Sequence, residues 1–224
     1  MPNPIEIQVY SDYLCPWCWP AAAHLKRLRE EFGAAVKVVR KAFLLRPEDA
    51  QREFAAYHLQ HRVAANEATG LPFHIPRAGD PYPRSSTWAQ EAAKWVDAHH
   101  PEKLEEFGLA LFRAFFQLTM DISNPAILSK LASSHGMDGA ALSAALERHD
   151  HRAAVLADQE EAQRRGVSAV PCVIIGDGSV SGFAPYEEYA AAVREELAAT
   201  SKEPARRARS RTSARPTGCA GPAA

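Results

Sequence analysis

Apolar and polar residues alternate along residues 5–10, which predicts a β-strand with one buried face. Leucine and phenylalanine then recur at helical spacing through residues 21–32, and Gly33 marks the end of that helix. A second apolar strand is predicted over residues 36–40. A strand, a helix and a strand of these lengths predict a βαβ unit, in which the two strands run parallel.

The middle of the chain is predicted to be helical. Residues 48–68 have a helical composition but are polar, and residues 70–83 form a long proline-rich loop. Further helices are predicted over residues 85–99, 101–118, 124–135 and 138–148. Phenylalanines mark two adjacent faces of the 101–118 helix, as expected of an ordinary core. The alternative is that some of these rings line a substrate groove.

The last part of the chain returns to strands. A charged helix over residues 151–166 precedes a short apolar strand over residues 173–175. Residues 177–178, Asp-Gly, predict a hairpin turn into a partner strand at residues 180–182. A helix over residues 186–199 follows. The whole pattern predicts an α/β fold.

Composition and charge narrow the class of protein. The 224 residues include 46% hydrophobic residues and have a formal net charge of −1, which gives no indication of a specific nucleic-acid or membrane partner. We find no signal peptide and no apolar stretch long enough to span a membrane, so a cytoplasmic protein is expected. Residues 200–224 are basic and rich in arginine, serine and proline, and are predicted to be a disordered tail. Cys219, in this tail, has no expected role.

Candidate chemistry is concentrated in Cys15-Pro16-Trp17-Cys18, between the first strand and its helix. Cys15 is expected at the helix N-cap and Pro16 at the first helical position. Backbone N–H groups and the helix dipole then stabilise a Cys15 thiolate as the attacking thiol. Cys18 is placed to resolve a mixed disulfide. Asp12, just before the motif, either influences the thiols or caps the loop.

Two other interpretations of a C-x-x-C motif are weaker here. Half of a zinc site would need a second cysteine or histidine pair at matching spacing, which the sequence lacks, so no metal site is predicted. An inert structural disulfide is typical of secreted chains.

A second informative stretch is Gly166-Val167 followed by Val170-Pro171-Cys172, where proline stands immediately before an apolar strand. Together with Ser11-Asp12-Tyr13-Leu14 before the cysteine motif and Ser181-Gly182-Phe183-Ala184-Pro185-Tyr186 near the end, this pattern resembles the DsbA family of the thioredoxin superfamily. The resemblance is to its FrnE-like cytoplasmic branch. It covers about residues 4 to 199.

The resemblance implies a thioredoxin-like fold with a helical insertion domain. Residues 1–47 and 150–199 would form the thioredoxin-like domain and residues 48–149 the insertion. Cys15 would be the nucleophile and Cys18 the resolving thiol, with Pro16, Trp17 and Asp12 as supporting residues. The Val170–Pro171 bond would be cis, and Val170, Pro171 and Cys172 would form the substrate-binding loop beside the dithiol.

The sequence departs from the family pattern at two positions. Trp17 replaces the histidine found between the cysteines of the periplasmic oxidant, so we expect a less oxidising couple. Cys172 replaces an apolar residue. It is either a buried small side chain or a third sulfur near Cys15 and Cys18, available for thiol exchange or metal binding.

The leading interpretation is therefore a thiol–disulfide oxidoreductase acting on protein or small-molecule thiols and disulfides, as a monomer or homodimer. No cofactor is expected beyond the redox-active disulfide, with glutathione or another low-molecular-weight thiol as a possible co-substrate. Two alternatives stay open. One is an enzyme like the glutathione-dependent isomerases and kappa-type transferases. The other is a thiol-based metal-binding or chaperone module.

Overall fold

The computed structural model describes residues 4–212, with side chains to residue 200. At its centre is a four-stranded sheet in the order β2–β1–β3–β4. Strand β1 (Ile5–Ser11) pairs in parallel with β2 (Val36–Ala42) and antiparallel with β3 (Cys172–Ile175), and β3 pairs antiparallel with β4 (Gly178–Ser181). The predicted parallel pair and hairpin are therefore confirmed.

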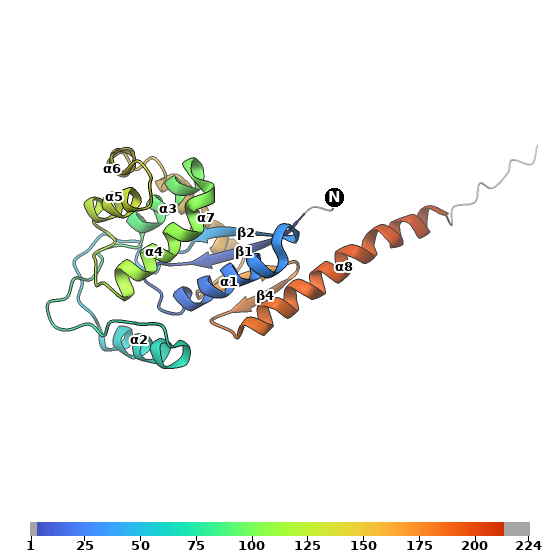
Figure 1. Ribbon diagram of the computed structural model, residues 1–224, viewed down its shortest axis with the longest axis horizontal. Helices are drawn as coiled ribbons and strands as arrows, with labels where there is room; N and C mark the ends of the chain where they lie inside the picture. The colour runs from blue at the N-terminus through green and yellow to red at the C-terminus, as the bar shows by residue number, and fades with distance from the viewer. Residues whose placement is uncertain (1–3, 213–224) are drawn as a thin grey trace, which may run out of the picture.

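The two faces of the sheet are covered by different helices (Figure 1). Ile7 and Val9 of β1 point to a core formed with α1 (Cys18–Phe32) and α8 (Tyr186–Thr212). Tyr10, the next residue, points to the opposite face, where α7 (Arg152–Arg164) contributes Ala162. This arrangement follows from the period of two along a strand, which sends neighbouring side chains to opposite faces.

Between β2 and α7 the chain forms a cluster of helices, seen at the upper left of Figure 1 except for α2, which lies below the others. They are α2 (Ala56–Thr69), α3 (Thr87–His99), the 3₁₀ turn η2 (Pro101–Lys103), α4 (Leu104–Phe116), α5 (Pro125–Ser134) and α6 (Gly139–Glu147). The Oδ1 atoms of Asn124 and Asp138 accept backbone N–H groups at the starts of α5 and α6. Both helices thus begin at polar capping residues.

One apolar core joins these helices to the cysteine motif. It includes Leu111 and Phe112 of α4 together with Cys15, Cys18 and Trp19. The motif is therefore buried against the inserted helices as well as lying at the end of the sheet. The domain division at residues 48 and 150 stays a prediction.

Several boundaries differ from those predicted. Helix α2 begins at Ala56 rather than at residue 48. Leu118, expected on the apolar face of the 101–118 helix, follows the end of α4 and is 61% exposed. Helix α8 ends at Thr212, past the predicted end at residue 199, while the disorder of residues 200–224 stays a prediction. Alanine, arginine, lysine and glutamate in that segment are strong helix formers.

Residues 213–224, including Cys219, lie outside the described part of the chain. Among the described residues, no helix has both the length and the apolar character needed to cross a bilayer.

Candidate active site

Cys15 lies in a tight turn between β1 and α1. Its backbone N–H donates to Asp12 O at 3.0 Å, and its carbonyl accepts from Cys18 N at 3.1 Å. The helix starts at Cys18 with Trp17 as N-cap, so the prediction that Cys15 caps the helix is wrong. The turn formed by residues 15–18 comes first, because the bond from Ala21 N to Trp17 O is the first helical one.

The two motif thiols are free and buried, with exposed fractions of 5% for Cys15 and 2% for Cys18. Burial is the largest cause that raises the pKa of Cys18 well above its ordinary value, and the adjacent Cys15 sulfur adds to it. Cys18 is therefore held as a neutral thiol beside Cys15, since a buried charge without a partner is costly. This arrangement suits a thiol that acts second.

The Val170–Pro171 peptide bond is cis, the isomer that the sequence predicts. The Cys15 thiol donates to the Val170 carbonyl oxygen at 3.3 Å, across 155 positions of sequence. On the other side of the loop, the Pro171 carbonyl accepts from Gly182 N at 2.8 Å. The loop before β3 is thus tied both to the cysteine turn and to the end of β4.

Asp12 is fully buried and ties the cysteine turn to the rest of the fold. Its Oδ1 accepts from Leu14 N at 2.7 Å, and its Oδ2 accepts from Leu45 N at 2.6 Å and from the Ser86 hydroxyl at 2.5 Å. Burial raises the pKa of Asp12 to about 6, against these hydrogen bonds, which lower it. The Asp12 charge also contributes to the raised pKa of Cys18. The hydrogen bond to Leu14 N is the loop cap considered from the sequence, whereas a functional influence of Asp12 on the thiols stays a prediction.

Trp17 closes one side of the motif. Its indole Nε1 donates to His61 Nδ1 at 3.0 Å, and its ring stacks on Phe183 with centroids 5.9 Å apart. The tryptophan therefore links α2 to the loop before α8, two segments far apart in the sequence. Pro16 beside it lines the same cavity as Cys15.

Cys172 does not join the other two sulfurs. It is buried with Tyr10, Phe43 and Ala162 on the α7 face of the sheet, whereas Val173 points to the α1 face. No three histidine, cysteine or acidic side chains within the described part of the chain form a group able to hold a metal ion. Of the two alternatives for Cys172, the structure therefore shows the buried small side chain and not a third sulfur near Cys15 and Cys18, because the alternation of β3 directs Cys172 away from α1.

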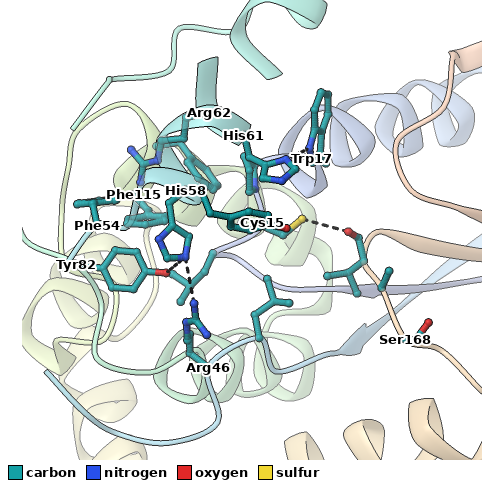
Figure 2. A pocket seen from close by; sticks show the side chains of 17 residues that line it. Cys15, Trp17, Arg46, Phe54, His58, His61, Arg62, Tyr82, Phe115 and Ser168 are labelled. Carbon is teal, nitrogen blue, oxygen red and sulfur yellow. Dashed lines mark hydrogen bonds between the residues drawn. The ribbon is translucent and has the colours of Figure 1, made fainter. Parts of the chain in front are cut away.

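A cavity of about 330 Å³ opens beside Cys15 (Figure 2). Its walls come from the cysteine turn, from the segment after β2, from α2, from α4 and from the loop before the cis-proline. Its side chains include Arg46, Phe54, His58, Tyr82, Phe115 and Phe116. Some phenylalanines of α4 thus do line a groove at the dithiol, while others, such as Phe107, lie in the core.

Sequence reasoning missed the polar residues of this cavity. His58, His61 and Arg62 have the spacing i, i+3, i+4, which places them on one helical face. That spacing was a usable signal, although the low apolar content of α2 indicated only a polar helix. Arg46 follows β2 in a stretch without any motif.

The fold and the site define a class of protein. A four-stranded mixed sheet with helices on both faces, a C-x-x-C motif at the start of the first helix and a cis-proline before the third strand constitute a thioredoxin fold, here with inserted helices. The family model of the DSBA-like thioredoxin domain matches residues 6–194, and the chain belongs to that family. Membership of the FrnE-like branch stays a prediction.

The chain is also similar to individual known proteins. The chain is 30% identical to the uncharacterized protein YwbO of Bacillus subtilis over 205 residues, 86% of this chain and 97% of that protein. Among solved structures it is similar to a candidate protein disulfide isomerase from Nitrosomonas europaea, with a TM-score of 0.75 and 23% identity over 89% of this chain and 98% of the other. It is also similar to the cytosolic disulfide reductase DsbM of Pseudomonas aeruginosa, solved with GSH, with a TM-score of 0.66 and 16% identity over 89% and 98%. At these identities the two structures support the fold alone.

Proposed function

We propose that the protein is a DsbA-like thiol–disulfide oxidoreductase in which Cys15 is the nucleophile and Cys18 the resolving thiol. The observation that carries the proposal is the bond from the Cys15 thiol to the Val170 carbonyl at 3.3 Å, beside an open cavity. A disulfide that reaches this cavity meets the Cys15 sulfur. The backbone carbonyl and N–H groups of an extended substrate peptide then pair with the cis-proline loop, as an added strand pairs with the edge of a sheet.

The reaction runs through two exchanges. The Cys15 thiolate attacks one sulfur of a substrate disulfide, forms a mixed disulfide and releases the other sulfur as a thiolate. The Cys18 thiolate then attacks the Cys15 sulfur, forms the Cys15–Cys18 disulfide and releases the second substrate thiolate. Because the pKa of Cys18 is raised, this step requires removal of its proton when the mixed disulfide forms. Two electrons pass from the protein dithiol to the substrate.

Several further properties belong to the same proposal. The redox-active disulfide is the only prosthetic chemistry that this reaction requires, and a low-molecular-weight thiol such as glutathione would serve as co-substrate. The reaction matches the name of DsbM, a cytosolic disulfide reductase. A cytoplasmic location, where thiols are kept reduced, is part of the proposal.

A mixed-disulfide trap tests the assignment of the two thiols. The Cys18→Ser variant, incubated with oxidised insulin, should accumulate a covalent complex on Cys15, because the resolving thiol is gone. The Cys15→Ser/Cys18→Ser double variant is the matched control and should form none at this site. Peptide mapping by mass spectrometry identifies the linked cysteine. A complex linked through any other cysteine contradicts the proposal.

The same variant separates the alternative enzyme class. The isomerases and kappa-type transferases use the thiol of glutathione itself, so their activity does not need Cys18. Glutathione-dependent turnover of a non-disulfide substrate by Cys18→Ser would favour that class. A chaperone function would instead appear as protection of an unfolding client that survives loss of both motif cysteines.

A further inference from the structure

The cavity beside Cys15 has an unusual charge balance. Two arginines, Arg46 and Arg62, line it, and none of its lining residues is an aspartate or glutamate. The rest of its wall is largely aromatic. Cavities of roughly 300–1,000 Å³ are the size that holds small molecules, and this one measures about 330 Å³. It therefore accommodates one small ligand rather than a folded segment.

Arg62 is a buried cation without a carboxylate partner. Its side chain is 1% exposed and lies against the rings of Phe54, Phe115 and Phe116, with centroid distances of 4.4 to 4.8 Å. Nη1 donates to the His74 carbonyl at 3.1 Å, whereas the buried Nη2 has no hydrogen-bond partner. Burial lowers the pKa of Arg62 to about 10, so the group stays protonated at neutral pH. A buried charged donor left unpaired is costly.

Arg46 is the second cation of the cavity, and its partners are neutral groups. The Ala55 N–H approaches Nδ1 of His58 at 3.2 Å, and Arg46 Nη2 approaches Nε2 of the same ring at 3.2 Å. The Tyr82 hydroxyl also approaches His58 Nε2 at 3.2 Å and accepts from Arg46, so this guanidinium has neutral acceptors but no carboxylate partner. Burial, followed by the charges of Arg46 and Arg62, lowers the pKa of His58, which keeps the ring neutral. Figure 2 shows His58 between the two arginines.

A third donor comes from His61. The indole N–H of Trp17 is a donor only, so His61 Nδ1 accepts it at 3.0 Å and the proton of the neutral ring is on Nε2. His61 lines the cavity together with Arg46 and Arg62. The cavity wall thus carries two cations and a further N–H donor, with no acidic side chain among its lining residues.

Nearby acids do not correct this imbalance. Asp12 and Asp80 influence Arg46 and Arg62 electrostatically, but neither lines the cavity. Asp12 is occupied by its three donors, from Leu14, Leu45 and Ser86. Asp80 accepts from Arg77 N at 2.7 Å and pairs with His74 at 2.9 Å. Within residues 4–200, neither arginine forms an ion pair with a carboxylate.

We propose that this cavity binds a low-molecular-weight disulfide that carries a carboxylate, with the carboxylate held by Arg46 and Arg62 and a disulfide sulfur placed at Cys15. This inference rests on the proposed function and names its substrate class. The carboxylate supplies the acceptor that Arg62 Nη2 lacks and a negative charge for Arg46, whose partners are neutral. The aromatic wall packs against the carbon chain of the ligand.

The chemistry is one complete thiol–disulfide exchange between the protein and the ligand. The Cys15 thiolate bonds to one ligand sulfur, the ligand S–S bond breaks, and one ligand thiolate leaves. The Cys18 thiolate then bonds to Cys15, and the second ligand thiolate leaves. The ligand disulfide gains two electrons and the protein dithiol loses them, and the two thiol protons pass to the released thiolates. A pre-reduced protein needs no other reductant for this single turnover.

Three small disulfides with the same two-carbon arms test the charge preference. They are dithiodipropionate, hydroxyethyl disulfide and cystamine, which are anionic, neutral and cationic. The rate at which each disulfide oxidises the reduced protein is followed by tryptophan fluorescence and by thiol titration. Each rate is divided by the rate at which the same disulfide reacts with free mercaptoethanol, which corrects for its intrinsic reactivity. We expect dithiodipropionate to be preferred over hydroxyethyl disulfide by at least about tenfold, a factor equal to about 1.4 kcal/mol. Cystamine should be the slowest of the three.

Charge-removing variants locate the preference. Arg46→Met and Arg62→Met should each lower the ratio of the anionic to the neutral rate by about tenfold, the effect expected for one charge-assisted hydrogen bond. Arg164→Met is the matched control, since its side chain is 69% exposed on α7 and does not line the cavity. It should leave the ratio unchanged. Thermal unfolding shows whether each variant folds.

A binding experiment on the unchanged protein keeps the inference testable if Arg62→Met does not fold. Adipate, which has carboxylates but no sulfur, should compete with dithiodipropionate, and hexanediol should not. Equal normalised rates for the three disulfides, or an Arg46→Met ratio equal to that of the unchanged protein, would overturn the carboxylate site while leaving the dithiol function intact. Failure of all three disulfides to oxidise Cys15 and Cys18 would overturn the proposed function as well.

Discussion

Cys15 and Cys172 are buried to nearly the same extent, 5% and 6% exposed, yet they lie in different chemical surroundings. Cys15 lines a cavity, bonds to the Val170 carbonyl and lies beside Cys18. Cys172 directly follows the cis-proline in sequence but packs on the α7 face of the sheet. Adjacency to the cis-proline in the sequence therefore does not bring a sulfur into the site. The face of the strand from which the side chain projects decides whether it lies there.

The largest expected effect is on turnover. Cys15→Ser should reduce insulin-disulfide reduction to the uncatalysed rate, because the attacking sulfur is removed. Cys172→Ala replaces a buried cysteine by a residue of similar size and should retain the insulin-reduction rate of the unchanged protein. The turbidity of precipitating insulin chains measures both. An equal loss of activity in a well-folded Cys172→Ala variant would show that the third thiol takes part.

The two regions are also held differently. The turn around Cys15 is held by the buried Asp12 carboxylate, while Cys172 is held by strand pairing with Tyr10 and Ser181. Because the Asp12 carboxylate can gain a proton, the stability of the turn around Cys15 depends on pH. The backbone hydrogen bonds that hold Cys172 do not titrate. This difference leads to the second prediction.

Asp12 should make the protein less stable as the pH rises. Its folded pKa is about 6 against an ordinary value of 3.8, so the protonated carboxyl favours the folded state. This contribution is fully present below about pH 4 and is lost as the pH rises through about 6, a change of roughly 3 kcal/mol in the free energy of unfolding. The Asp12→Asn variant cannot titrate. Chemical denaturation measures the free energy of unfolding of both proteins at pH 4 and pH 7. The difference in this free energy between the two proteins should change by roughly 3 kcal/mol between the two pH values.

The direction of this shift decides the outcome. The unchanged protein should lose stability relative to Asp12→Asn on going from pH 4 to pH 7. A shift of the opposite sign would mean that the three hydrogen bonds to Asp12 outweigh its burial. The Asp12 carboxylate would then have a lowered folded pKa.

The smallest expected effect concerns the reduction potential. Trp17 contributes no positive charge next to Cys15, so the couple should lie closer to about −270 mV than to about −120 mV. Trp17→His should raise the potential by some tens of millivolts, because an imidazolium favours the thiolate. Trp17→Phe is the control, since it also loses the bond to His61 Nδ1 without adding a charge. Equilibration with glutathione buffers measures all three, and equal potentials for the two variants would contradict the electrostatic explanation.

The local pattern of the chain predicted much of the fold. Alternation at residues 5–10 and the Asn-Pro start at residues 124–125 depend on backbone preferences of a few neighbouring residues, and each is found where expected. The hairpin is also present, but its turn is Gly176-Asp177, one residue before the predicted Asp-Gly pair, because Gly178 already pairs with Ile175. The resemblance carried by Cys15, Cys18 and Pro171 added the isomer of the Val170–Pro171 bond.

Helix ends were less accurate. Cys15 lies in a turn before α1, and α2 starts at Ala56, because these ends are set by contacts with distant segments. Phe54, just before α2, packs on Tyr82 and Phe115 instead of continuing a helix. Composition alone contains no information about such contacts.

The sequence by itself determined the dithiol, the cis-proline loop and the order of the elements around them, because those features depend on short stretches of chain. Only the tertiary structure decided that Cys172 points away from Cys18. It also decided that Arg46 and Arg62 line one cavity with Cys15 and that no acidic side chain lines it. The physical reason is that burial, charge balance and unsatisfied donors arise where residues far apart in sequence come together. A lone arginine in a polar helix gives no sign of its future neighbours.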